Sequence, residues 1–133
     1  MKKRQRLTRS ADFQKVYRQG KSVSGRYLVL YYFNRTAGSG AGEPRLGVSV
    51  SKKVGGAVQR NRVKRVLKES FGHLSGTLAT SFDYVIIARP GLAEYIEKSQ
   101  FEEVTAALAE LFRRAGLIQK ADLLEAHTNL TNR

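Results

Sequence analysis

The seven-residue run from Tyr27 to Phe33 is the feature that most constrains how this chain folds. It consists of aromatic and branched aliphatic residues, which are enriched in β-strands. Because side chains alternate along a strand, Leu28, Leu30 and Tyr32 share one face, while Tyr27, Val29, Tyr31 and Phe33 share the other. Both faces are apolar. We therefore expect this strand to lie in a sheet that other elements cover on both sides.

Further segments have the patterns of regular structure. Three are helices: one capped by Thr8 or Ser10 and ended by Gly20, one from Ala57 to His73, and one that begins with a capping box at Ser99 and Glu102 and stops at Gly116. Three are extended: a short segment at 23–26 that leads into the apolar run, an alternating strand from Arg45 to Ser51, and a strand from Phe82 to Arg89. This order predicts an α+β fold: a single-layer mixed four-stranded sheet packed with three helices, in the order αβββαβα.

The chain of 133 residues is the size of one domain. We expect residues 1–118 to form it and residues 119–133 to be a polar, frayed C-terminal tail. Cysteine is absent, which excludes disulfides, thiol nucleophiles and Cys-ligated zinc. No run of about 18 apolar residues is present, and the basic N-terminus lacks the apolar stretch of a signal peptide. These features predict a soluble, cytoplasmic protein with no membrane partner.

The positive charge is concentrated in one half of the chain. The formal net charge is +13, yet residues 1–68 carry 18 Lys and Arg against two acidic residues, and residues 69–133 carry six against nine. Segment 45–68 has eight basic residues and no acidic one. A generic solubilising charge would be interspersed with acids, whereas concentrated charge indicates a polyphosphate partner. Nucleic acid is the favoured partner, and an anionic membrane surface is the alternative.

The predicted helix from Ala57 to His73 presents this charge on one side. At about 100° per residue, Asn61, Lys64, Arg65 and Lys68 lie opposite its apolar stripe, with Arg60 and Arg62 on the flanks. Like charges at this spacing destabilise a helix unless a counter-charge neutralises them. A solvated helix face usually alternates in sign, and this one does not. The pattern therefore favours an RNA-binding helix.

An aromatic pair provides a second candidate site. Phe13 and Tyr17 are four residues apart and share one face of the first helix. If that helix lies beside the strand from Tyr27 to Phe33, the two rings, Val29 and Tyr31 could line a groove on which unpaired bases stack. The competing interpretation is that the pair belongs to the core, which is the commoner role for aromatics at this spacing.

The sequence contains no recognisable enzymatic site. His73 and His127 have no paired histidine or catalytic neighbour, and Lys52-Lys53 before Gly55-Gly56 is not a nucleotide-binding loop. Five glutamates between residues 94 and 110 could be imagined as a metal cluster, but they are more typical of solvent-facing helix charges. We therefore expect no catalytic residue and no metal bound by the protein itself.

The residues now described resemble a known family. The block Arg45-Leu-Gly-Val-Ser-Val-Ser-Lys-Lys53 followed by Arg60-Asn-Arg-Val-Lys-Arg65 is similar to the signature of the protein subunit of bacterial ribonuclease P. The resemblance continues through the segments Leu7–Tyr17 and Tyr84–Arg89 and spans the chain from about Arg6 to Leu117. The family commonly has Arg where this chain has Lys68, which retains the charge but not the forked contact.

The resemblance implies an endoribonuclease that removes the 5′ leader of precursor tRNA, with Mg²⁺ held by the RNA subunit and one protein per RNA. It implies that the basic helix docks on the catalytic RNA through Arg60, Asn61, Arg62, Lys64, Arg65 and Lys68. It also implies a cleft for the single-stranded leader, lined by Phe13, Tyr17, Val29, Tyr31, Ser49 and Lys53. A left-handed crossover between the strands Arg45–Ser51 and Phe82–Arg89 is implied too, against the usual right-handed rule.

Two other classes of protein compete with this interpretation. A ribosomal or other structural RNA-binding protein would use the same basic helix but would need no aromatic cleft. A stand-alone metal nuclease would need clustered carboxylates at strand ends, and the sequence lacks that pattern.

Overall fold

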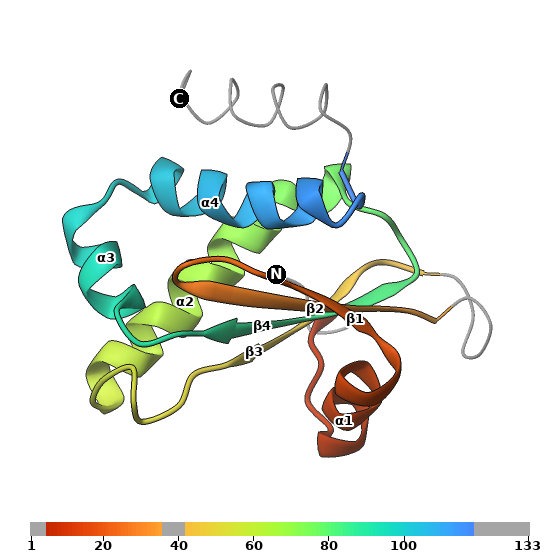
Figure 1. The fold of residues 1–133 in the computed structure, drawn as a ribbon, viewed down its shortest axis with the longest axis horizontal. Helices are drawn as coiled ribbons and strands as arrows, with labels where there is room; N and C mark the ends of the chain where they lie inside the picture. The colour runs from red at the N-terminus through yellow and green to blue at the C-terminus, as the bar shows by residue number, and fades with distance from the viewer. Residues whose placement is uncertain (1–4, 36–41, 119–133) are drawn as a thin grey trace.

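Four strands form one mixed sheet at the centre of the protein. In this computed structural model, which describes residues 5–35 and 42–118, they are β1 (Lys21–Ser24), β2 (Leu28–Asn34), β3 (Arg45–Ser49) and β4 (Phe82–Ala88). The sheet order is β1-β2-β4-β3, with β3 parallel to β4 and the other two pairs antiparallel (Figure 1). The α+β fold with a four-stranded mixed sheet, predicted from the sequence, is confirmed.

In the part of the chain that the structure describes, four α-helices pack around the sheet. They are α1 (Ser10–Gln19), α2 (Ala57–Leu74), α3 (Leu92–Lys98) and α4 (Phe101–Arg114), with a short 3₁₀ turn, η2 (Ser75–Thr77), after α2. The expectation of three helices was wrong by one. Segment 92–98 buries Leu92, Ala93 and Ile96 and begins after Gly91, whose φ of 99° is left-handed. With seven residues, α3 is too short for its helical period to stand out in the sequence.

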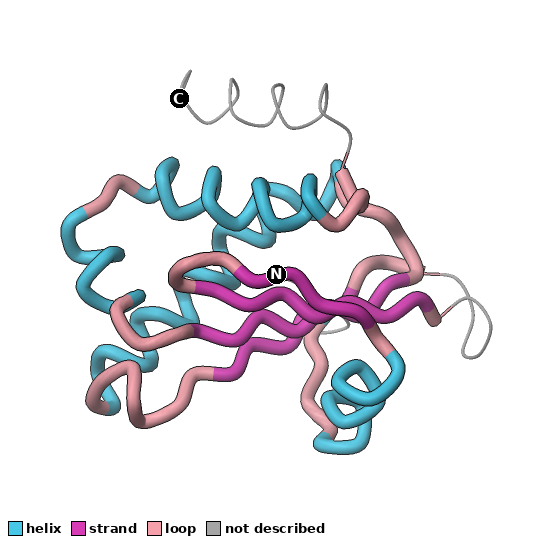
Figure 2. The backbone as a smooth tube through the Cα atoms, viewed as in Figure 1, coloured by secondary structure: helices cyan, strands magenta, loops and turns pink. Residues whose placement is uncertain are grey.

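The main core lies on one face of the sheet, between the strands and helices α2, α3 and α4. Leu30 and Tyr84 from the strands meet Leu67 and Phe71 from α2 and Phe112 from α4, all with 0% exposure. Rings of Phe71, Tyr84 and Phe112 contact one another with centroids 5.0–6.3 Å apart. Figure 2 shows α3 and α4 towards the top of the view, α2 passing behind the sheet, and α1 below the sheet at the lower right.

A smaller cluster lies on the opposite face, beneath α1. Val16 of α1 and Val85 of β4 are completely buried there, and Leu7 joins them from the segment before the helix. A backbone hydrogen bond from Leu7 N–H to Leu46 O ties that segment to β3. The sheet is thus covered on both faces, as the apolar strand at Tyr27 to Phe33 indicated.

Several boundaries differ from the sequence-based expectations. The first helix has Arg9 as its N-cap and no side-chain cap, so neither Thr8 nor Ser10 caps it. The capping box of α4 is made by Gln100 and Glu103, one residue later than expected, because Glu103 accepts the Gln100 backbone N–H at 3.3 Å. The entry expected at 23–26 is instead the strand Lys21–Ser24, after which Gly25 N–H donates to Leu28 O in a turn.

The connection from β3 through α2 to β4 is the crossover expected between two parallel strands. Its handedness stays a prediction from the resemblance. The expected polar tail at residues 119–133 lies outside the described residues, as does the glycine-rich segment Ala37–Gly42 except for Gly42.

Candidate nucleic-acid interface

The basic helix α2 is oriented by its apolar stripe. Val63, Leu67 and Phe71 are 1% exposed or less and bury one side of the helix against the sheet. This burial turns the opposite side outward. Asn61, Arg62 and Arg65 are exposed there, while Arg60, Lys64 and Lys68 are half-buried. Of the six residues that the sequence pattern placed opposite or beside the apolar stripe, three are therefore exposed in the structure and three only in part.

The cations of α2 are left almost without acidic partners. Within the described ranges, the only ion pair that any of them makes joins Arg62 to Glu97 at 3.9 Å, with both side chains about half exposed (48% and 52%). An exposed pair at that distance contributes little stability. The Nε of Arg60 is buried and has no hydrogen-bond partner among the described residues. The face formed by Arg60, Asn61, Arg62, Lys64, Arg65 and Lys68, here called the α2 basic face, retains its charge for an external anion.

Aromatic side chains gather on the other face of the sheet, along one flank of α1. The ring of Tyr17 meets that of Tyr31 edge-on with centroids 5.1 Å apart, and Phe13 lies 6.5 Å from Tyr17. Val29 lies on the same face of β2, two residues from Tyr31, and Ile87 lies opposite it on β4. All of these side chains are half-buried, so they support α1 and still present surface to solvent. We call them the aromatic patch: Phe13, Tyr17, Val29, Tyr31 and Ile87.

Polar groups border the aromatic patch at β3. Ser49 is paired with Ile87 in the sheet and makes a side-chain hydrogen bond with Tyr17. Burial raises the pKa of the Tyr17 phenol, and the Ser49 hydrogen bond offsets part of that rise. The phenol is therefore neutral at physiological pH and presents no negative charge to a nucleic acid. Lys53 is exposed in the turn that leaves β3 towards α2.

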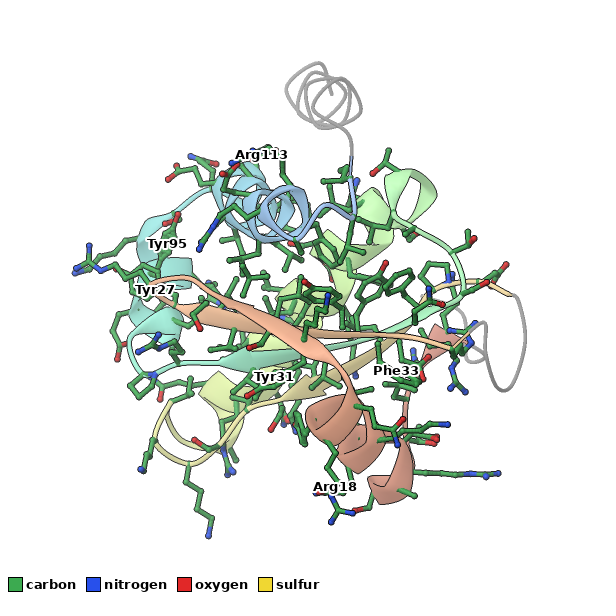
Figure 3. All side chains as sticks on the ribbon, turned by 45° about the vertical axis from the view of Figure 1, so that its right-hand side comes forward. Arg18, Tyr27, Tyr31, Phe33, Tyr95 and Arg113 are labelled. Atoms are coloured by element: carbon green, nitrogen blue, oxygen red, sulfur yellow. The ribbon has the colours of Figure 1, made fainter. Side chains whose placement is uncertain are left out.

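The two surfaces meet around one edge of the sheet. β3 is an edge strand, with the aromatic patch on one of its faces and α2 packed on the other. The turn through Lys53 joins them, anchored by Val54, which is 4% exposed. An extended ligand lying along this edge could touch both surfaces. Figure 3 shows Tyr31 on the sheet above α1, with Arg18 at the outer side of the helix.

Comparison with known proteins shows the family to which the chain belongs. The family model for Ribonuclease P matches residues 1–116. The chain belongs to the ribonuclease P protein family. The ribonuclease P protein component of Bacillus pumilus is 40% identical over 120 residues, covering 90% of this chain and 95% of that protein. The corresponding protein of Alkaliphilus metalliredigens is 39% identical over 118 residues, covering 89% and 99%.

Solved structures of ribonuclease P proteins share this fold. A Staphylococcus aureus RNase P protein mutant, described as defective in mRNA degradation activity, matches with a TM-score of 0.75 and 32% identity over 87% of this chain and 92% of that one. The Thermotoga maritima RNase P protein matches with a TM-score of 0.72 and 33% identity over 82% and 96%. The family suggested by the resemblance is thus confirmed.

Two features of this ribonuclease P protein were not foreseen from its sequence. Ile87 completes the aromatic patch, but in sequence it is one of several apolar residues in a buried strand. The second feature is an ion cluster in which Asp83, 4% exposed, accepts hydrogen bonds from Arg35 at 2.9 Å and from two nitrogens of Arg45 at 2.8 Å. Asp83 raises the pKa of the Arg45 guanidinium through this hydrogen bond, against the opposing effect of its burial. The only available signal was that Arg45 and Asp83 occupy polar positions in predicted strands.

Over residues 5–35 and 42–118, no three His, Asp or Glu side chains lie close enough to hold a metal ion together. Of the helices in the described part of the chain, none has the length and apolar character needed to cross a bilayer.

Proposed function

We propose that this protein is the cytoplasmic protein component of ribonuclease P and promotes removal of the 5′ leader from precursor tRNA. The α2 basic face binds the catalytic RNA subunit, and the aromatic patch with Ser49 and Lys53 holds the single-stranded leader. The observation that carries this proposal is the lack of acidic partners on α2, since among its cations only Arg62 is paired within the described residues, and at 3.9 Å. Phosphates of a folded RNA would neutralise that charge and release condensed counterions.

The division of labour follows from the chemistry of the two surfaces. Guanidinium and ammonium groups on a rigid helix match phosphates in position and charge, while aromatic rings stack with unpaired bases. Precursor tRNA carries a leader and mature tRNA does not. Contacts to the leader therefore favour the substrate over the product by differential binding. Mg²⁺ held by the RNA subunit would supply the chemistry at the scissile phosphate by activating a water molecule. The protein then contributes binding and orientation, with one copy per RNA.

Reconstitution tests the proposal directly. Purified protein is mixed with a bacterial ribonuclease P RNA at a magnesium concentration at which the RNA alone is nearly inactive, and cleavage of precursor tRNA is followed on a gel. We expect cleavage at the mature 5′ end only when both components are present. Cleavage equal to that of RNA alone would reject the proposal, and cleavage by the protein alone would reject the assignment of catalysis to the RNA.

A further inference from the structure

A polar pocket lies beside the first turn of α1, at the end of the sheet where β3 and β4 begin. Its volume is about 390 Å³, and it is lined by Arg6, Thr8, Arg9, Asp12, Lys15, Phe33, Arg35, Arg45 and Asp83. We call it the α1 pocket. Five of its lining side chains are cationic and two are acidic, so the pocket carries a net positive charge.

The α1 pocket and the aromatic patch lie on opposite flanks of the same helix. Val16 faces the sheet, and the helical repeat places Phe13 and Tyr17 to one side of it and Asp12 and Lys15 to the other. Register supports this placement, because Arg45, Asp83 and Phe33 form one row across the sheet, while Gly47, Val85 and Tyr31 form the next. Figure 3 shows Tyr31 and Phe33 on the two sides of α1. The α1 pocket is therefore separate from the proposed leader site.

The floor of the α1 pocket is already neutralised. Asp83 is shared by Arg35 and Arg45, whose side chains are 8% and 30% exposed. Arg35 also donates to the carbonyl oxygens of Phe82 at 2.8 Å and Glu43 at 2.6 Å, which holds it in place. With both guanidiniums bonded to it, the Asp83 carboxylate does not repel an incoming anion as a free carboxylate would.

The rim of the α1 pocket retains unneutralised charge. Arg6, Arg9 and Lys15 are exposed, and in the described part of the chain none of them forms an ion pair. The ammonium of Lys15 is held over the Phe33 ring, 5.3 Å from its centroid. Three cations thus surround an opening whose only acid outside the neutralised floor is Asp12. Two guanidinium groups, which can each donate two parallel hydrogen bonds, and one ammonium group together suit a phosphate oxyanion.

We propose that the α1 pocket binds a phosphodiester group of RNA through Arg6, Arg9 and Lys15, on the flank of α1 opposite the aromatic patch. The choice of RNA rests on the proposed function, whereas the affinity for phosphate follows from the pocket itself. An RNA contact here would hold α1 from its second side. One segment of RNA would then position the helix that carries Phe13 and Tyr17, while the rings of these two residues contact another segment of RNA.

The first experiment measures phosphate binding by the full chain, without RNA. Inorganic phosphate is titrated into ¹⁵N-labelled protein at constant ionic strength, and backbone amide shifts are followed. We expect saturable shifts at Thr8, Arg9 and Asp12, and an affinity reduced about fivefold or more in the Arg6→Gln, Arg9→Gln double variant. The matched control is Arg18→Gln, which removes a charge from the exposed side of the same helix and should change the affinity by less than about twofold. Shifts confined to α2, or an equal loss in the control, would overturn the proposal.

The second experiment measures RNA binding with the same variants. We expect the double variant to bind ribonuclease P RNA, or the precursor in the assembled complex, about fivefold or more weakly than the Arg18→Gln control does. Phosphate binding without any RNA effect would show a site for free phosphate and overturn the RNA assignment. Since both charges are on exposed side chains, circular dichroism should show an unchanged fold. Failure of the proposed function is distinguishable, because it would appear in wild-type protein as no activation of cleavage.

Discussion

The ring of Phe13 lies against the backbone of Gly47, in the space that a side chain at position 47 would occupy. A Cβ built on Gly47 would overlap with the end of that ring. On the face of β3 that carries Arg45 and Ser49, Gly47 has no side chain, which leaves room above the strand there. At Gly47 that room is filled by the protein's own Phe13, which docks α1 on β3.

The substitution Gly47→Ala therefore tests how α1 packs against β3. We expect the added methyl to displace the Phe13 ring and to lower the free energy of unfolding by about 1–3 kcal/mol, as overpacking does. Urea denaturation provides the measurement. In a Phe13→Ala background the same substitution should cost much less, because the clashing ring is gone. Equal costs in the two backgrounds would show that the contact does not determine the effect.

The buried carboxylate of Asp83 should be essential for stability. Asp83→Asn leaves two guanidiniums facing a neutral amide, and breaking a buried ion pair in this way costs about 3–5 kcal/mol. Chemical denaturation monitored by circular dichroism gives the value. The matched control is Glu97→Gln, which removes the exposed partner of Arg62 and should change stability by less than about 1 kcal/mol. Similar losses in both variants would contradict a special role for the buried cluster.

Charge removal on the α2 basic face should weaken RNA assembly. We expect Lys64→Ala and Arg65→Ala each to lower the affinity for ribonuclease P RNA and to reduce the slope of log affinity against log salt by about one. Filter binding over a salt series measures both quantities. Arg113→Ala on α4 removes an equal charge that is paired with Glu110, and it serves as the control. Wild-type affinity and slope in the α2 variants would place the RNA elsewhere.

Aromatic stacking should appear as discrimination between precursor and mature tRNA. Phe13→Leu keeps an apolar side chain against Gly47 but removes the ring, so we expect the affinity of the assembled complex for leader-bearing precursor to fall by about 1–3 kcal/mol. Binding of mature tRNA, which lacks the leader, should be unchanged. Tyr17→Phe retains the ring and serves as the control. If Phe13→Leu weakened both ligands equally, Phe13 would be a packing residue only.

Local patterns in the sequence determined much of this fold. The run from Tyr27 to Phe33, apolar on both faces, predicted a sheet covered on both sides. The basic helix was placed correctly because the residues of its buried stripe, Val63, Leu67 and Phe71, recur at helical spacing in the sequence. The helix α3 was missed because seven residues carry too little periodicity. The capping residues of α1 and α4 were wrong by one position, since neighbouring polar residues are nearly equivalent as caps until backbone geometry selects one.

By itself, the sequence determined which residues share a strand or helix face, because that depends only on the repeat of each element. It thereby determined the α2 basic face and the pairing of Phe13 with Tyr17. Only the tertiary structure decided that α1 crosses the sheet, and that Arg35, Arg45 and Asp83 meet from segments up to 48 residues apart. Those contacts depend on strand order and register, and these in turn are set by how the whole core packs rather than by any local run of residues.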